Sequence, residues 1–343
     1  MILITSASTA KDVVFDLLQK MDLKMDVVAH YFALYLSETG SAIDRYVEPE
    51  ETMSSIVSQW EGESVSKFVF MIRLFMPSIM GLQYPDVVSG RCGTGPDGEL
   101  ALEKYLQEAE VIDRQLLHLQ YIQAVYNVIT GKYPTSPELA LELGAYQFLH
   151  KFGDFDECSH RAGFLGDRAI EFIPLALLRD STSGRTVSQW ECALLQWARA
   201  THEQSLDVSD RLFKGVPGLD PQKKYLELVM LDLCDHYGCA LFPCVQTAFI
   251  TLPDEVLVSV HKDGLDLVST EANHELLVHF SLANIEKVGV KAAKKKRGPA
   301  VFYFDIKTDS LGSNKKKFRN FTTFDLTSVH SSAICQLIID YQN

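Results

Sequence analysis

The spacing of hydrophobic positions changes twice along the 343 residues of this chain. Residues 1–77 mix short apolar runs with one helical stripe, residues 100–238 keep a helical spacing, and residues 239–343 alternate over short runs. One face of a helix repeats every three to four residues, whereas one face of a strand repeats every second residue. The pattern therefore predicts an α+β multidomain chain with three lobes, in which residues 78–99 form a linker.

The first lobe is predicted to order its elements as strand, helix, strand, short helix and strand. The strands are "MILIT", "YFALYL" and "KFVFMIRLF", and the helix has an apolar stripe formed by Val13, Val14, Leu17, Leu18 and Met21. This order is typical of a ubiquitin-like unit. Such a unit begins with a hairpin of two strands, but only one strand fits before the helix. We therefore expect the opening strand to be missing.

The second lobe is predicted to be a bundle of antiparallel helices, because its helical runs have clear start and stop signals. Ser136 and Pro137 open one helix that Gly153 ends, and Asp220 with Pro221 opens another that runs to Gly238. Ser, Thr, Asp and Asn are favoured at the N-cap, Pro at the first helical position and Gly just after the end. Ser188 and Glu191 are predicted to form a capping box. The remaining helix, 111–131, should bury Ile112, Leu116, Leu119, Tyr126 and Ile129 and end at Gly131.

The third lobe is predicted to be a β-barrel closed by one helix. About seven short strands are separated by Gly, Asn, Lys and Asp, and "TSVHSSAICQLIIDYQ" at residues 327–342 is amphipathic. Seven strands followed by a C-terminal helix describe a pleckstrin-homology (PH) or phosphotyrosine-binding (PTB) barrel.

Three stretches make the chain resemble the FERM family. "LLHLQYIQAVYNVITGKYP" is similar to the first long helix of the second FERM lobe. "LELGAYQFLHKFGDFDECSHRAGFL" resembles that lobe's A-x-x-L-A-A-Y-x-x-Q-x-x-x-G-D-[YF]-D pattern, although Gly144 replaces an alanine and Gln147 lies one place off. "YLELVMLDLCDHYGCALF" resembles the junction into the third lobe. The resemblance implies a ubiquitin-like lobe (1–77), an acyl-CoA-binding-protein-like helical bundle (100–238) and a PH/PTB-like lobe (239–343).

The "YFALYL" and "YGCALF" stretches point to an atypical branch of the family. They look more like the sorting-nexin, Krev-interaction-trapped and iRhom-binding FERM proteins than like ezrin, radixin and moesin.

Composition narrows the class of function. The net charge is −13, no apolar run reaches the length of a membrane span, and the seven cysteines form no C-x-x-C pair. An acidic chain with scattered free thiols is typical of a cytosolic protein that does not bind nucleic acid in bulk. The charge is uneven, however. Residues 286–343 hold eleven Lys and Arg against five Asp and Glu, and the first 285 residues hold 21 against 40.

Motifs that suggest enzymes lack the right context. Gly93, Gly95 and Gly98 form a G-x-G-x-x-G, but no strand ends at the first glycine and Pro96 removes a backbone donor. We therefore expect a linker, with a nucleotide-dependent enzyme as the alternative. His274, Glu275 and His279 resemble H-E-x-x-H, but the histidines are five apart in a strand-like run, which puts them on opposite faces.

A group of cysteines and histidines surrounds the junction into the third lobe. It consists of Cys234, His236, Cys239 and Cys244. Because these residues lack the paired spacing of a zinc site, we expect buried free thiols there. No metal, cofactor or catalytic residue is predicted in the chain.

Two basic runs flank the predicted strand "VFYFDIK". They comprise Lys294, Lys295, Lys296 and Arg297, and Lys315, Lys316, Lys317 and Arg319. Each such residue near an anionic leaflet contributes about 1 kcal/mol. The runs are either solvated loops or a patch that binds phosphoinositide or other anionic lipid, and a nuclear-localisation signal is a further interpretation of "KKKR".

A peptide groove is implied by the resemblance. PTB-like barrels bind an extended peptide beside the fifth strand and against the C-terminal helix. Here the strand would supply Ile285, Lys287, Val288, Gly289 and Val290, and the helix Ile334, Leu337, Ile338 and Tyr341. Gly289 suits this use, because a missing side chain permits close approach of the ligand backbone. The alternative is that the helical residues only close the barrel.

The sequence therefore predicts a non-catalytic cytosolic adaptor. Its partners would be the cytoplasmic tails of membrane proteins and the anionic inner membrane surface, linking the membrane to the cytoskeleton or to trafficking machinery. The oligomeric state stays open.

Overall fold

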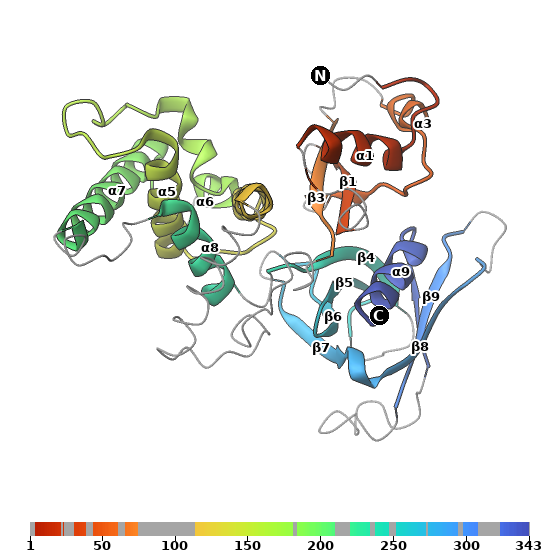
Figure 1. Cartoon of the computed structure of the whole chain (residues 1–343). Coiled ribbons are helices and arrows are strands. Elements are labelled where there is room, and N and C mark those ends of the chain that lie inside the picture. The colour runs from red at the N-terminus through yellow and green to blue at the C-terminus, as the bar shows by residue number, and fades with distance from the viewer. Residues whose placement is uncertain are drawn as a thin grey trace. The chain divides into compact units, whose positions relative to one another are not determined.

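The computed structural model has a mixed α/β architecture of helices and antiparallel sheets (Figure 1). It describes residues 4–21, 23, 31–38, 44–60, 66–74, 114–180, 184–209, 220–233, 237–246, 252–271, 274–293, 298–307 and 323–342. The chain divides into two compact units. One unit joins Met1–Gly81 to Gly238–Asn343, and the other is Leu82–Tyr237.

The described residues of the first segment of the chain form a small sheet and two helices. The elements are α1 (Ala10–Lys20), β1 (Phe32–Glu38), β2 (Arg45–Tyr46), α3 (Met53–Val57) and β3 (Ser66–Ile72), and the sheet order is β2-β1-β3. A capping box between Thr9 and Asp12 starts α1. Val13, Val14 and Leu18 of the predicted stripe are buried. Of the three predicted strands, "YFALYL" and "KFVFMIRLF" coincide with β1 and β3, while Met1–Leu3 of "MILIT" lie outside the described residues.

In the described ranges, the helical unit contains a helix over residues 114–129 and five further elements. These are α5 (Pro137–Phe152), the 3-10 helix η4 (Gly166–Glu171), α6 (Leu175–Arg179), α7 (Val187–Ser209) and α8 (Pro221–Asp232). The predicted caps of α5 and α8 are confirmed. The Ser136 hydroxyl accepts a hydrogen bond from the Leu139 amide, and the Asp220 carboxylate accepts from the Gln222 amide. Helix α8 ends at Asp232, earlier than the predicted end at Gly238.

The predicted capping box at Ser188 and Glu191 is wrong. Helix α7 begins at Val187, and the box pairs Thr186 with Gln189: the Thr186 amide donates to Gln189 Oε1 at 2.8 Å. Glu191 is buried, and it accepts a 2.6 Å hydrogen bond from the Leu165 amide. The acid therefore ties α7 to the segment before η4, because its side chain points into the unit and away from its own helix terminus.

The predicted face of the first helix is also shifted. Leu116 is buried as expected, but Leu119, Tyr126 and Ile129 are only partly buried. Its buried side is completed by Leu117, Gln120, Tyr121, Ala124, Asn127 and Val128. Gln120 and Asn127 thus lie on the buried side of the helix, and the spacing of apolar residues does not predict their burial. Ile112 lies outside the described residues.

Gly144 of α5 is required by its packing. A Cβ atom at this position would lie 2.8 Å from Leu194 Cδ1 and 3.0 Å from the Phe172 carbonyl oxygen. The buried cluster around it includes Phe148, Phe172 and Trp190. The glycine that replaces the family's alanine therefore lets α5 approach α7 and the end of η4 closely.

The C-terminal segment forms a seven-stranded antiparallel sheet with one helix. The strands are β4 (Ala240–Gln246), β5 (Glu255–His261), β6 (Gly264–Val268), β7 (Leu276–Ser281), β8 (Ile285–Lys291), β9 (Val301–Ile306) and β10 (Thr323–Thr327). They are ordered β7-β6-β5-β4-β10-β9-β8. Helix α9 (Ser331–Gln342) contacts β5, β8 and β9, although β5 and β8 are not neighbours in the sheet. The sheet therefore curves around α9 (Figure 1).

Candidate functional site

The first candidate site is the outer edge of β8. This strand is the last in the sheet order, and in the described part of the chain it pairs with β9 alone. An edge strand presents backbone N–H and C=O groups on its unpaired side, so another extended segment can pair with it. The register with β9 shifts between Ile285 and Lys287, which marks a bulge near the start of the strand.

Helix α9 closes the sheet and does not offer an open apolar groove. Ile334, Leu337, Ile338 and Tyr341, the four residues predicted to face a peptide, are all buried. Gln342 at the end of the helix donates a 3.0 Å hydrogen bond to the Ile285 carbonyl. The side chains of α9 thus belong to the core and hold the first residue of β8, so a ligand would meet mainly the strand from Lys287 to Lys291.

Gly289 of β8 is needed because of a side chain on the neighbouring strand, and not because of a ligand. A Cβ atom on Gly289 would lie 2.6–2.7 Å from the Tyr303 ring of the neighbouring strand. The Lys291 ammonium lies 4.5 Å from the centre of the same ring and 2.7 Å from Asp325 Oδ1. The absent side chain therefore makes room for Tyr303. Close approach of a ligand backbone is not needed to account for it.

The remaining side chains of β8 make its edge polar with one apolar position. Glu286, Lys287 and Lys291 are exposed, Val288 is half-buried, and Val290 has 41% of its surface exposed. Charged residues on an edge strand oppose unselective pairing with other chains. Val290 is thus the apolar contact that this edge presents most openly.

Two predicted sites lie outside the described residues. They are the basic runs, Lys294–Arg297 and Lys315–Lys317 with Arg319, and the glycine loop at 93–98. In sequence, the first run joins β8 to β9 and the second joins β9 to β10. The runs therefore connect to opposite ends of β9, and each is best tested separately.

A cavity of about 520 Å³ lies in the unit that contains α9, and sequence reasoning did not find it. Its lining includes Phe15 and Phe32, with Lys11 and Glu48 among its charged residues. Arg73 also lines it and forms an ion pair with Asp340 of α9. Burial raises the pKa of Glu48, with a further contribution from Glu51. Positive and negative side chains thus share the lining, and the cavity has no bias towards an anionic headgroup.

The histidines and cysteines are arranged differently from the motifs in the sequence. His279 does not group with His274 or Glu275 but with His261 and Asp266. Cys244 is a buried free thiol, as expected, and burial raises its pKa to about 12. Cys239 is a half-buried free thiol, and Cys234 and His236 lie outside the described residues.

No helix in the described ranges combines the length and the apolar character needed to cross a bilayer. This finding agrees with the absence of a long apolar run in the sequence.

Two parts of the chain match known domain families. Residues 107–242 match the FERM central domain, and residues 1–74 match an RA like domain. FERM domain-containing protein C of Dictyostelium discoideum is 29% identical over 174 residues, which are 50% of this chain and 9% of that protein. The chain therefore corresponds to a small part of this relative.

Solved structures show the same fold over nearly the whole chain. The MyTH4-FERM MF2 domain of Dictyostelium discoideum myosin VII has a TM-score of 0.60 and 13% identity, covering 98% of this chain and 55% of that one. The complex of the FERM and C-terminal domains of Drosophila Merlin has a TM-score of 0.55 and 16% identity, covering 99% and 89%. The assignment to an atypical branch stays a prediction. Residues 107–242 thus carry a FERM central domain, and nearly the whole chain shares its fold with structures that contain a FERM domain.

Proposed function

We propose that the chain is a non-catalytic binding module that holds an extended segment of another protein along the free edge of β8. The observation that carries this proposal is the position of β8 at the end of the sheet, with β9 as its one partner among the described strands. An added strand gains main-chain hydrogen bonds from such an edge, and the flanking side chains select its sequence. The cytoplasmic tails of membrane proteins are segments of this kind.

The comparisons support a protein partner. The structure of Drosophila Merlin is a complex of its FERM domain with its C-terminal domain, so a FERM domain of similar fold holds another protein segment there. For this chain, binding a tail at the membrane and linking it to the cytoskeleton or to trafficking machinery is part of the proposal.

The sharpest probe of the edge is Val290→Asp with Val245→Asp as its matched control. The two valines have 41% and 46% of their surface exposed, but Val245 lies on β4, which pairs with a strand on each side. We expect Val290→Asp to weaken binding of a tail peptide at least tenfold, or about 1.4 kcal/mol. The control should bind like the parent, because Val245 itself is paired with β5 on one side and with β10 on the other.

The ligand backbone offers a second test. Methylating alternate backbone nitrogens of the peptide removes the donors that a β-ladder needs, and we expect it to abolish binding. Methylating the other set of nitrogens, shifted by one residue, should weaken binding less, because those N–H groups point away from β8. Leu337→Asp is unsuitable because Leu337 is buried, and Gly289→Trp would collide with Tyr303. The partner site does not lie on β8 if Val290→Asp binds the peptide as tightly as the parent and if the parent binds the methylated peptides as tightly as the unmethylated one.

We further propose that the two basic runs bind anionic membranes. Binding to phosphatidylserine vesicles should weaken as salt rises, because exposed charges act over about 8 Å at physiological ionic strength. Lys294→Glu with Lys295→Glu, and separately Lys316→Glu with Lys317→Glu, should each reduce co-sedimentation, and the four together should abolish it. Lys11→Glu with Lys20→Glu on α1 makes the same change in net charge as either pair and should leave binding nearly intact. If all variants sediment like the parent, the runs are solvated loops.

The enzyme alternative is tested on the same protein. Binding of ATP or NAD that is lost in Gly93→Ala with Gly95→Ala would replace the adaptor with a nucleotide-dependent function. We expect no such binding.

A further inference from the structure

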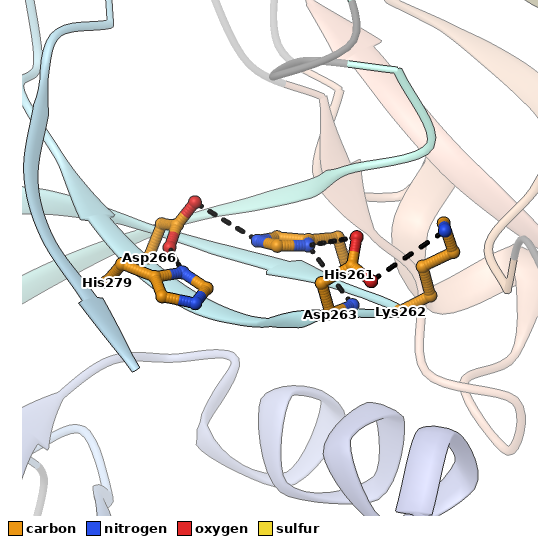
Figure 2. Close-up of polar contacts among 5 residues, drawn as sticks. All are labelled: His261, Lys262, Asp263, Asp266 and His279. Carbon is orange, nitrogen blue, oxygen red and sulfur yellow. Dashed lines mark hydrogen bonds and ion pairs between the residues drawn. The ribbon is translucent and has the colours of Figure 1, made fainter. Parts of the chain in front are cut away.

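Three polar side chains from three adjacent strands meet on one face of the sheet (Figure 2). Asp266 of β6 lies directly opposite His279 of β7 in the strand register. It also pairs with Ser259 of β5, and His261 lies two residues further along that strand on the same face. Residues that are five and thirteen positions apart in the sequence are thus brought together by two consecutive hairpins.

The carboxylate of Asp266 lies between the two imidazole rings. Asp266 Oδ2 is 3.0 Å from His261 Nε2, and Asp266 Oδ1 is 2.6 Å from His279 Nδ1. The Asp263 amide donates a 3.3 Å hydrogen bond to His261 Nδ1. Because Nδ1 accepts this bond, a neutral His261 carries its proton on Nε2, where it points at Asp266.

The group is shielded from water without being sealed. The exposed side-chain fractions of His261, Asp266 and His279 are 15%, 14% and 25%. Burial by itself raises the pKa of Asp266, but the hydrogen bonds from the two histidines oppose it, and the net effect lowers this pKa. The carboxylate is thus flanked by two imidazoles, and each of the three side chains keeps part of its surface exposed to solvent.

Gly264 provides the space for one of the rings. A Cβ atom at this position would lie 2.8 Å from His279 Cε1 and 2.4 Å from the Phe280 carbonyl oxygen. Any larger residue here would displace the His279 ring or separate the two strands. The position of His279 beside Asp266 thus depends on a glycine in the neighbouring strand.

We propose that His261, Asp266 and His279 form a site for a divalent first-row transition metal such as Zn²⁺ or Co²⁺. Each residue offers one ligand atom, and these atoms all lie within 4.8 Å of one another. Two imidazole nitrogens and one carboxylate oxygen are a donor set that zinc and its neighbours bind, whereas Ca²⁺ and Mg²⁺ prefer oxygen alone. Three protein ligands leave at least one coordination position open.

The metal takes the place of the two imidazole protons that now point at the carboxylate. Each neutral ring shifts its proton to its other nitrogen, and the freed lone pair binds the ion, so no group has to be ionised further. For His261 that other nitrogen is Nδ1, which must then give up the hydrogen bond from the Asp263 amide. A ligating histidine usually donates its second N–H to a carboxylate or carbonyl, and Asp263 Oδ2 lies 3.9 Å from Nδ1, so this carboxylate has to move closer to accept it.

The test uses the full-length chain without a histidine tag, freed of metal with a chelator and titrated with Co²⁺. We expect one saturable equivalent with visible d–d absorption and no strong near-ultraviolet band from thiolate ligands. Asp266→Asn, His261→Gln and His279→Gln should each weaken binding at least tenfold. His202→Gln is the matched control, because His202 also lies near a carboxylate, that of Asp154 at 3.5 Å, but is not part of the group of three ligands. It should bind Co²⁺ like the parent.

Folding is checked for each variant by circular dichroism and by its metal-free thermal midpoint. Co²⁺ should raise the midpoint of the parent and of His202→Gln but not that of Asp266→Asn. The proposal is overturned if the parent shows no saturable equivalent, or if Asp266→Asn binds as tightly as the parent. In the first case the three side chains are only a hydrogen-bonded clamp across the strands. A thiolate band that persists in all variants would place the ion on cysteines and would equally overturn the proposal.

Discussion

Two glycines of the seven-stranded sheet lie beneath a ring from the neighbouring strand, Gly264 near one end of the strand order and Gly289 at the other. At Gly264 the closest atom to an added Cβ is a backbone oxygen, that of Phe280, at 2.4 Å. At Gly289 all the closest atoms belong to the Tyr303 ring. Neither glycine has a left-handed backbone, so each is required for space alone.

The two glycines differ in how well the sheet can accommodate a larger residue. A side chain can rotate away from an added methyl group, whereas a backbone carbonyl moves only with its strand. We therefore expect a larger residue to be tolerated poorly at Gly264, at the β6–β7 end, and better at Gly289, at the β8–β9 end.

The largest expected effect is that of Gly264→Ala. The new methyl group must push β6 away from β7, which we expect to cost about 3 kcal/mol or more. Native-state hydrogen exchange of the β6 and β7 amides measures this cost within the sheet. Adding His279→Ala should not relieve it, because the Phe280 oxygen stays in place. Full relief by His279→Ala would mean that the ring, and not the backbone, is the obstacle.

Gly289→Ala should have a smaller effect, about 1 kcal/mol. The Tyr303 ring can turn away from the methyl group, at the loss of its contact with Lys291. In a double-mutant cycle with Tyr303→Ala the penalty should disappear, since the atoms that crowd the methyl group are gone. A penalty that persists in the double variant would make the two glycines equivalent and remove the contrast.

Acid should weaken both ends of the sheet together, because α9 contacts β5 as well as β8. Burial lowers the pKa of His330, just before α9; Arg45 lowers it further, and Glu51 acts in the opposite direction. As pH falls, His330 is protonated in the unfolded chain before it is protonated in the folded one. The contribution of a neutral, buried His330 to folding stability is therefore present above about pH 6.5 and is lost as pH falls towards the lowered pKa. Hydrogen exchange of α9 should show the decline, and His330→Gln should flatten it. A decline confined to one end of the sheet would contradict this prediction.

The smallest effect is expected for Lys291→Met. The ion pair with Asp325 is nearly half exposed on both sides, and such pairs contribute about 0.5 kcal/mol. Unfolding in urea should therefore change little, and high salt should reduce the difference from the parent. A loss above about 2 kcal/mol would show that the β8–β9 end is as tightly held as the β6–β7 end.

Local signals in the sequence predicted many of the elements correctly. Ser136 caps α5, Asp220 caps α8, and Gly131 and Gly153 take the left-handed backbone expected just after a helix. Each of these features depends on residues within one helical turn, so the sequence contains everything needed. The predicted strand "NIEKVGV" at 284–290 likewise overlaps β8, and the burial of the α9 side chains beside it agrees with the alternative that they close the barrel.

Features that depend on distant partners were missed or misread. Glu191 suits a capping box by its spacing, yet it binds the Leu165 amide 26 residues away. Gly289 suits a ligand approach, yet its neighbour is the ring of Tyr303. In both cases the sequence correctly indicated a special role for the residue, a hydrogen bond for Glu191 and a close neighbour for Gly289. The predicted partner was wrong, because the true partner is distant in sequence and leaves no local pattern.

Short-range periodicity and backbone chemistry within one turn were enough to predict the three hydrophobic spacings along the chain, the caps of α5 and α8 and the family motifs. Which strand is the edge and which side chains meet across strands follow only from the pairing of the strands in the folded sheet. His261, Asp266 and His279 show the physical reason: strand register brings together residues whose spacing in sequence carries no signal.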